Sequence, residues 1–313
     1  MNIIKYRYLY FAISLLVIIP GMLALASWGL SLGIDFTGGS LLEVQFASGN
    51  PPTITDVADL YSEFSTPAMD ISNPIVQPLP PDALSIRSKE MDDATKGQVV
   101  AAMKERFGGG KDVTILNFTQ VSAAVGQEVT RAATIAVFMA ALAILIYIWF
   151  AFRKVQHAFR YGTAAVIAML HDVLVVIGVE AIIGHFLGWQ VDSLFLTALL
   201  TVIGFSVHDT IVVFDRIREN SNIYRRVEFG TVVNHSVVQT LDRSINTQLT
   251  VMITLLALAL FGGTSIRHFV IILLVGVFSG TYSSIFNASP ILVVWENKEW
   301  RNWFRRKDES VIA

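Results

Sequence analysis

One acidic residue inside an apolar stretch of the sequence is the first candidate for chemistry. The stretch TVIGFSVHDTIVVFDRIREN covers residues 201–220, and Asp209 lies six residues before the charged pair Asp215 and Arg216. If Asp215 marks the end of a membrane helix, Asp209 lies roughly 9 Å inside the membrane. A carboxylate at that depth costs at least about 2.5 kcal/mol, so it requires a partner, water, or both.

A second apolar stretch, LDRSINTQLTVMIT at residues 241–254, offers such a partner in Arg243. A helix advances about 100° per residue, so four further polar residues fall on the same side as Arg243 and extend roughly 16 Å along it. They are Asn246, Thr247, Thr250 and Thr254. Hydroxyl and amide groups in such a stripe can hold ordered water. The pattern predicts a titratable carboxylate that faces an arginine at the base of a hydrated path.

Two functions of this pair remain open. With Arg243 close, Asp209 stays ionised, and when the two separate, burial favours the protonated form. A proton that crosses the membrane releases about 2.3 kcal/mol per 100 mV, which could drive a rearrangement of the helices. The alternative is a fixed ion pair that locks the fourth and fifth helices together. The Asn and Thr stripe favours the proton switch, because a lock needs no hydrated path.

Other titratable residues give weaker signals. His171 and Asp172 lie near the middle of the third apolar segment, where they could extend a proton relay or form a hydrogen-bonded structural pair. His208 precedes Asp209 and is a further relay candidate. Glu180 and His185 lie near the outer end of the same third segment, where we expect them to be solvated.

The composition defines the setting of these residues. The chain has 313 residues, of which 53% are hydrophobic and 15% charged, against about 25% charged in soluble proteins. It is therefore an integral membrane protein. It has no cysteine, which excludes disulfides, thiolate metal sites and a cysteine nucleophile, and its six histidines form no HExxH motif. We expect no enzyme activity, cofactor, metal or nucleic-acid partner.

The hydropathy pattern predicts a polytopic α-helical membrane protein with six transmembrane helices. The predicted spans are Tyr8–Leu32, Val129–Phe150, Tyr161–His185, Leu194–Phe214, Gln239–Phe261 and His268–Val294. We expect the first to be an uncleaved helix, because its apolar run is longer than that of a signal peptide. Basic residues precede the first span, follow the second and fourth spans, and fill the tail at residues 295–313. The positive-inside rule therefore predicts that both termini are cytoplasmic.

This topology leaves residues 33–128 outside the cytoplasm, between N-terminal residues 1–32 and the remaining helices at 129–294. SLLEVQF and VTILNF alternate like half-buried strands, and NPIVQPLPPDALSIRS fits two short strands. TITDVADLYSEF has helical spacing, and SKEMDDATKGQVVAAMKERFGGG reads as a helix stopped by glycines. The order β-α-β-β-α-β predicts a ferredoxin-like α+β domain between helices 1 and 2.

Four motifs in order resemble the SecF family of the bacterial Sec protein-export machinery. They are GIDFTGGSLLEV, LHDVLVV, HDTIVVFDRIREN and RSINTQLT. The resemblance implies half of a twelve-helix assembly of the resistance-nodulation-division (RND) superfamily, with SecD as the other half. It also implies a proton-driven role in moving unfolded preprotein out of the SecYEG channel. The positions that match the family's proton pathway are Asp209, Arg243 and Thr247.

The resemblance therefore implies a multi-pass protein of the bacterial inner membrane that acts with SecD, SecYEG and preprotein. Two other functions remain open from the residues: half of a small-molecule proton antiporter of the same superfamily, and a scaffold of the Sec complex without a transport role. The single outer domain of about 95 residues favours the export role, since exporters of this superfamily usually carry two large outer domains.

Overall fold

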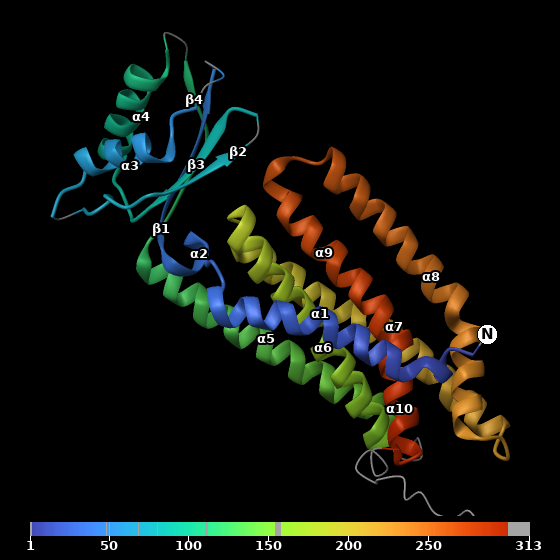
Figure 1. The fold of residues 1–313 in the computed structure, drawn as a ribbon. Coiled ribbons are helices and arrows are strands. Elements are labelled where there is room, and N and C mark those ends of the chain that lie inside the picture. The colour runs from blue at the N-terminus through green and yellow to red at the C-terminus, as the bar shows by residue number, and fades with distance from the viewer. Residues whose placement is uncertain are drawn as a thin grey trace, which may run out of the picture. The chain divides into compact units, whose positions relative to one another are not determined.

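The computed structural model consists of two compact units, shown together in Figure 1. One comprises Ser31–Ala136 with Gln190–Ser193, and the other comprises the remaining helices. The structure describes residues 2–47, 49, 51–67, 69–79, 81–109, 112–153 and 158–299. Most of the predicted basic tail, residues 300–313, lies outside the described residues.

Six helical segments are long and apolar enough to cross a membrane, which confirms the predicted number. The first five are α1 (Arg7–Trp28), α5 (Ala123–Phe152), α6 (Ala158–Leu187), α7 (Ser193–Ile223) and α8 (Phe229–Phe261). The sixth consists of α9 (Thr264–Ser283), the π-helical turn η2 (Ser284–Ala288) and α10 (Ser289–Glu296). A short 3₁₀ helix, η1 (Ile4–Tyr6), precedes α1. Helix α8 begins at Phe229, ten residues before the predicted span at Gln239, because the polar residues of its first turns kept them out of the hydropathy-based span.

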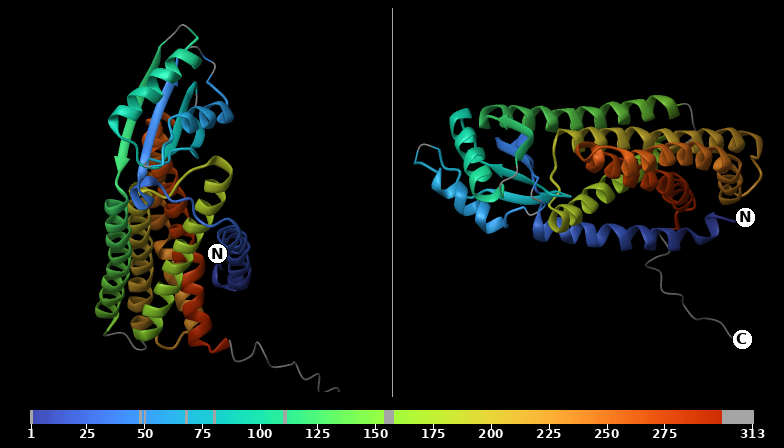
Figure 2. Two further views of the ribbon diagram at one scale, coloured as in Figure 1. Left: turned by 90° about the vertical axis from the view of Figure 1, so that its left-hand side faces the viewer. Right: turned by 90° about the horizontal axis from the view of Figure 1, so that it is seen from above.

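Small residues bring these helices together, and the helices run roughly alongside one another (Figure 2). Helix α1 meets α6 at Gly21 and Gly178, where a Cβ on Gly21 would lie 2.7 Å from the Cα of Gly178. Helix α9 meets α7 at Gly276, where a Cβ would overlap the side chain of Val202. Backbones approach closely at such positions because no side chain intervenes. Close packing of α9 leaves its neighbouring serines within reach of α6 and α7.

The unit that comprises Ser31–Ala136, called the ferredoxin-like unit below, contains a four-stranded antiparallel sheet covered by two helices. Its strand order is β2-β3-β1-β4. This order and the chain order β-α-β-β-α-β are those of a ferredoxin-like fold, as the sequence predicted. The elements are α2 (Ile34–Thr37), β1 (Gly39–Phe46), α3 (Ile54–Glu63), β2 (Ile75–Leu79), β3 (Ala83–Ser88), α4 (Asp93–Phe107) and β4 (Val113–Val121).

The ferredoxin-like unit has its own hydrophobic core, since alternate residues of β1 are buried against α3 and α4. Helix α3 starts at a capping box, in which the Thr53 hydroxyl accepts from the Asp56 backbone and the Asp56 carboxylate accepts from Thr53. The Thr53 hydroxyl also donates to the Asp56 carboxylate over 2.7 Å, and this hydrogen bond, together with the one from the Thr53 backbone N–H, lowers the pKa of Asp56. Tyr61 on α3 is fully buried, and this burial raises the pKa of its phenol.

Candidate functional site

Asp209 lies on α7 with 5% of its surface exposed. The Ser244 hydroxyl on α8 donates to its Oδ1 over 2.7 Å, and the Ser284 hydroxyl in η2 donates to its Oδ2. Both carboxylate oxygens therefore have a hydroxyl partner from another segment. A buried carboxylate satisfied by hydroxyls alone lacks a compensating positive charge nearby.

Arg243 does not occupy the position that the sequence suggested. Its side chain is exposed, and within the described part of the chain it makes no ion pair with Asp209. Consecutive residues of a helix point about 100° apart, so the neighbour Ser244 faces Asp209 and Arg243 faces away. The expected geometry is thus corrected, since a helical wheel identifies one polar face but not which face packs inward. The role of Arg243 in proton transfer stays a prediction.

The rest of the predicted stripe also lies on the exposed side of α8. Asn246, Thr247, Thr250 and Thr254 are all exposed. The hydroxyls of Thr250 and Thr254 donate to carbonyls one turn back on α8, over 2.8 and 3.0 Å. His208 is exposed on α7. The sequence therefore grouped the α8 residues correctly on one face, but this face points out of the chain.

A second carboxylate, Asp172 on α6, is completely buried. Its Oδ2 accepts from Ser206 on α7 over 2.5 Å and from Ser283 on α9 over 2.6 Å. Its Oδ1 accepts from Ser279 on α9 over 2.6 Å and lies 3.0 Å from His171 Nδ1. Asp172 thus links α6 to α7 and α9 through three hydrogen bonds, and a fourth joins it to His171 on its own helix. It is more completely hydrogen-bonded than Asp209, which the sequence ranked first.

The five serines around the two carboxylates are functional candidates that the sequence reasoning missed. On a membrane helix, serine is equally typical of a close-packing face, so its hydroxyl carries no signal by itself. A signal exists in the spacing: Ser279 and Ser283 are four residues apart and share one face, and Ser284 follows directly.

A third buried acid, Glu180 on α6, pairs with His268 on α9. Their Oε2 and Nε2 atoms are 2.8 Å apart, and Glu180 is 1% exposed. The rings of Trp189 and Phe195 pack on the His268 ring, with centroids 4.8 and 6.2 Å away. The expectation that Glu180 is solvated was wrong, because Glu180 is buried and pairs with His268 of α9. His185 stacks on Trp28, with ring centroids 4.1 Å apart.

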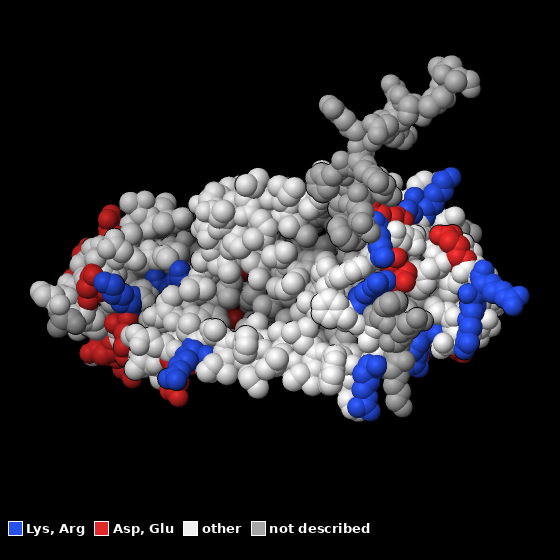
Figure 3. Space-filling view, turned by 90° about the horizontal axis from the view of Figure 1, so that it is seen from below, with Lys and Arg blue, Asp and Glu red and all other residues white. Residues whose placement is uncertain are grey.

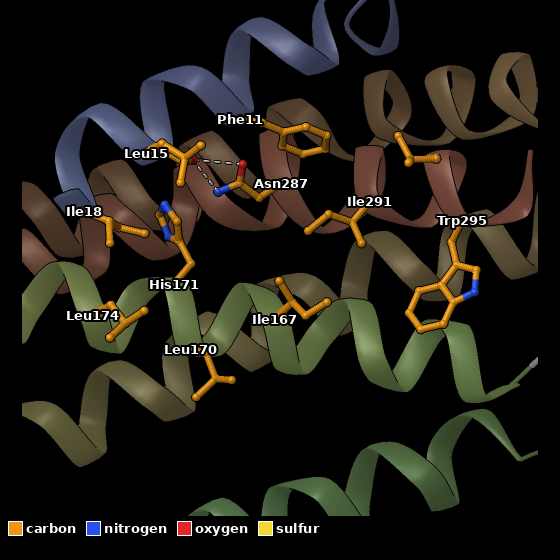
Figure 4. Close-up of a pocket in the computed structure, with 12 residues that line it drawn as sticks. Phe11, Leu15, Ile18, Ile167, Leu170, His171, Leu174, Asn287, Ile291 and Trp295 are labelled. Carbon is orange, nitrogen blue, oxygen red and sulfur yellow. Dashed lines mark hydrogen bonds between the residues drawn. The ribbon is translucent and has the colours of Figure 1, made fainter. Parts of the chain in front are cut away.

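An apolar pocket of about 700 Å³ lies between α1, α6, η2 and α10, and His171, the neighbour of Asp172, lines it (Figure 4). His171 and Asn287 point into the space between these helices. Asn287 and Ser14 hydrogen-bond each other over 2.8 and 3.0 Å, which ties η2 to α1. On the face drawn in Figure 3, a broad uncharged band runs along the helical unit, as a membrane-spanning protein requires.

These six helices, the ferredoxin-like unit and the buried carboxylates define a multi-pass membrane protein of the protein-export class, as comparison with known proteins shows. The family model "Protein export membrane protein SecD/SecF, C-terminal" matches residues 100–298, and "SecD/SecF GG Motif" matches residues 24–49. The chain is 57% identical to protein translocase subunit SecF of Anaerolinea thermophila over the full length of both proteins. It is 49% identical to the protein of that name from Thermobaculum terrenum, covering all of this chain and 99% of that protein.

A solved structure shares the fold as well. The crystal structure of SecDF from Thermus thermophilus, a translocon-associated membrane protein, matches with a TM-score of 0.82 and 29% identity. The match covers 95% of this chain and 39% of that chain. The chain therefore belongs to the SecF family of protein translocase subunits.

Proposed function

We propose that this chain is a proton-motive-force-driven accessory subunit of the Sec translocase, which acts with SecD to promote preprotein export through SecYEG. The observation that carries the proposal is a buried, titratable Asp209 inside a six-helix bundle of the SecF family. In this proposal Asp209, Arg243 and Thr247 form the proton pathway. Asn246, Thr250 and His208 are relay candidates on the outward faces of α8 and α7.

The partners of Asp209 suit a change of protonation. A serine hydroxyl can donate to an ionised carboxylate or accept from a protonated one, whereas an arginine can only donate. Ser244 and Ser284 therefore satisfy Asp209 in both states by rotating their hydroxyls. This supports Asp209 as a group that gains and loses a proton without leaving an unpaired buried atom.

The exposed polar face of α8 supports a second membrane subunit as partner. An arginine and an asparagine that face hydrocarbon are costly, and polar residues in membrane helices face protein or water-filled cavities. Arg243 and Asn246 therefore call for a neighbouring membrane protein that covers them. SecD is the partner we propose, because the similar SecDF chain is much longer than this one.

The proposed setting is the bacterial inner membrane, with both termini in the cytoplasm and the ferredoxin-like unit on the other side. There the unit would contact unfolded preprotein as it leaves SecYEG. Movement of the helices on protonation would reach this unit through α1 and α5, since these helices are continuous with its two ends in the chain.

Export of a secreted reporter in cells whose only copy carries Asp209→Asn tests the proposal. The amide keeps the size of the side chain but cannot ionise, so we expect export to fail while the protein inserts at normal levels. The matched control is Asp215→Asn, which removes an exposed carboxylate on the same helix. Normal export with Asp209→Asn would leave only a scaffold role, and proton-linked export of small molecules instead of preprotein would favour an antiporter.

A further inference from the structure

Two of the buried carboxylates, Asp172 and Asp209, are bound by consecutive residues of the sixth helical segment. Ser283 donates to Asp172 and Ser284 donates to Asp209. On the other side, Ser206 donates to Asp172 and lies on α7 one turn before Asp209. Asp172 and Asp209 are therefore connected through two segments: the adjacent serines Ser283 and Ser284, and the turn of α7 from Ser206 to Asp209.

The shared segment lies at a break in the helix. Helix α9 ends at Ser283 and the π-helical turn η2 begins at Ser284. A π-helical turn widens a helix locally and is found frequently at functional sites. Here the junction directs one serine towards α6 and the next towards α7. Three residues further on, Asn287 of the same turn holds α1 through Ser14.

We propose that Asp172 is a second proton-binding carboxylate, coupled to Asp209 through the Ser283–Ser284 segment. This inference rests on the proposed function for Asp209 and extends it to a pair. It assigns to Asp172 a role beyond that of a hydrogen-bonded structural residue, and to η2 the role of the element that responds to both protons.

The physical basis of the coupling is repulsion and shared hydrogen bonding. Two ionised carboxylates in a buried setting repel each other, so ionisation of one disfavours ionisation of the other. A proton that binds to Asp172 also requires one of its hydroxyl donors to rotate and accept. Because Ser283 and Ser284 are adjacent, rotation of the Ser283 hydroxyl changes the local geometry around Ser284, which donates to Asp209.

The remaining titratable groups around the pair are few. On α6, His171 contacts Asp172, and on α9 the ring of Tyr282 stacks on His171 with centroids 6.2 Å apart. Helix α8 contributes Ser244, while its Arg243 faces away. Within the described residues no hydrogen-bond partner is found for His171 Nε2. Within the described residues, His171 is thus the titratable side chain that hydrogen-bonds to one of the two carboxylates.

An infrared titration of the full chain reconstituted in lipid vesicles tests the coupling directly. The carbonyl band of protonated carboxyl groups is followed from about pH 4 to about pH 9, and each band is assigned by its loss in Asp172→Asn or Asp209→Asn. We expect the Asp172 band to titrate, and its proton affinity to change by about tenfold in the Asp209→Asn protein. Removing one charge makes the other carboxyl easier to ionise.

A matched pair of serine variants tests the route. Ser283→Ala and Ser279→Ala each remove one donor to Asp172, and both hydrogen bonds are 2.6 Å long. Only Ser283 is adjacent to the serine that holds Asp209. In a double-mutant cycle with Asp209→Asn, we expect Ser283→Ala to reduce the coupling severalfold and Ser279→Ala to leave it unchanged. Both variants keep both carboxylates, so the test stands even if Asp172→Asn fails to fold.

Three results would overturn the inference. An Asp172 band that does not titrate would make Asp172 a structural acceptor. An Asp172 titration that is identical in wild type and Asp209→Asn would show that the two carboxylates are not coupled. Equal effects of the two serine variants would show that the coupling does not pass through Ser283 and Ser284. None of these readouts involves export. A coupled pair with normal export of Asp209→Asn would therefore refute the proposed function and leave the coupling intact.

Discussion

Two polar surfaces of the helical unit differ in how their polar groups are satisfied. Between α6, α7 and α9, the buried carboxylate Asp172 has four partners from the chain itself. On the outer face of α8, Arg243 and Asn246 are exposed along an apolar helix. On the inner surface the Asp172 carboxylate is therefore satisfied by this chain, whereas we propose that a neighbouring membrane protein covers the outer surface.

This difference separates folding from function. A self-satisfied polar interface fixes the positions of three helices, so its residues act on the stability of the isolated chain. An exposed polar face contributes little to that stability, and in the proposed function its residues act on assembly with a partner. Asp209 lies on the inner side, because Ser244 binds it from the buried face of α8 and Ser284 binds it from η2.

The largest effect is expected from Asp172→Ala, which breaks the inner surface. The substitution leaves three serine hydroxyls buried without their acceptor, and we expect a loss of roughly 2–4 kcal/mol in the free energy of unfolding. Thermal unfolding of the full chain in detergent, followed by tryptophan fluorescence, measures it. A midpoint equal to that of wild type would show that the cluster does not hold α6, α7 and α9 together.

A smaller effect is expected from a methyl group added to the packed side of α9. A Cβ at Gly276 would overlap Val202, so Gly276→Ala should cost about 1–3 kcal/mol through overpacking. The control is Gly204→Ala on the exposed side of α7, where a Cβ would meet no atom within 4 Å. The same thermal measurement applies to both. Equal effects of the two alanines would contradict the close approach of α7 and α9.

Arg243→Gln tests the exposed polar face of α8. Because Arg243 has no ion-pair partner among the described residues of this chain, we expect the free energy of unfolding of the isolated chain to change by less than about 0.5 kcal/mol. Recovery of SecD with the tagged chain from membranes should fall severalfold. A large loss of stability in the isolated chain would mean that Arg243 serves this chain's own fold.

The smallest effect is expected in the ferredoxin-like unit, which contributes residues to neither polar surface. Hydrogen bonds and ion pairs lower the pKa values of five exposed carboxylates there: Asp56, Glu63, Asp70, Asp92 and Asp112. Their stabilisation is present above the unfolded values near about 4 and is lost as pH falls through the lower folded values.

Hydrogen exchange of peptides from β1 and β4 in the full chain, corrected for intrinsic rates, measures this acid loss. We expect modestly weaker protection below about pH 4, because exposed ion pairs contribute little. The Asp70→Asn variant removes the carboxylate that Lys89 and Ser72 bind, so its loss of protection should be shallower than that of wild type. Identical profiles would exclude Asp70 from the effect.

The sequence supported the number of membrane helices and the ferredoxin-like order, because both depend on local periodicity and on turn residues. It also placed Asp209 in an apolar helix, and α7 is long and apolar enough to cross a membrane. It did not predict the partners of Asp209, because hydropathy and helical wheels are properties of single helices. Which face of α8 packs inward depends on Ser244 and on the close approach of other helices.

Two further residues illustrate the same limit. Glu180 lies near the end of its predicted span, which suggested a solvated side chain, but it is 1% exposed and pairs with His268, whose ring packs against Trp189. Ser283 carries no chemical signal in the sequence, yet its hydroxyl binds a fully buried carboxylate. Both depend on contacts between residues about 90 and 110 positions apart, which no local pattern encodes.

The most direct test of proton coupling at Asp209 is preprotein movement driven by an imposed proton gradient. Vesicles that contain the chain with SecD and SecYEG are loaded with a partly translocated preprotein, and its completion is measured with and without the gradient. We predict that the gradient accelerates completion in wild type and has no effect in Asp209→Asn, although the variant assembles with its partners. An equal acceleration in both proteins would contradict the account.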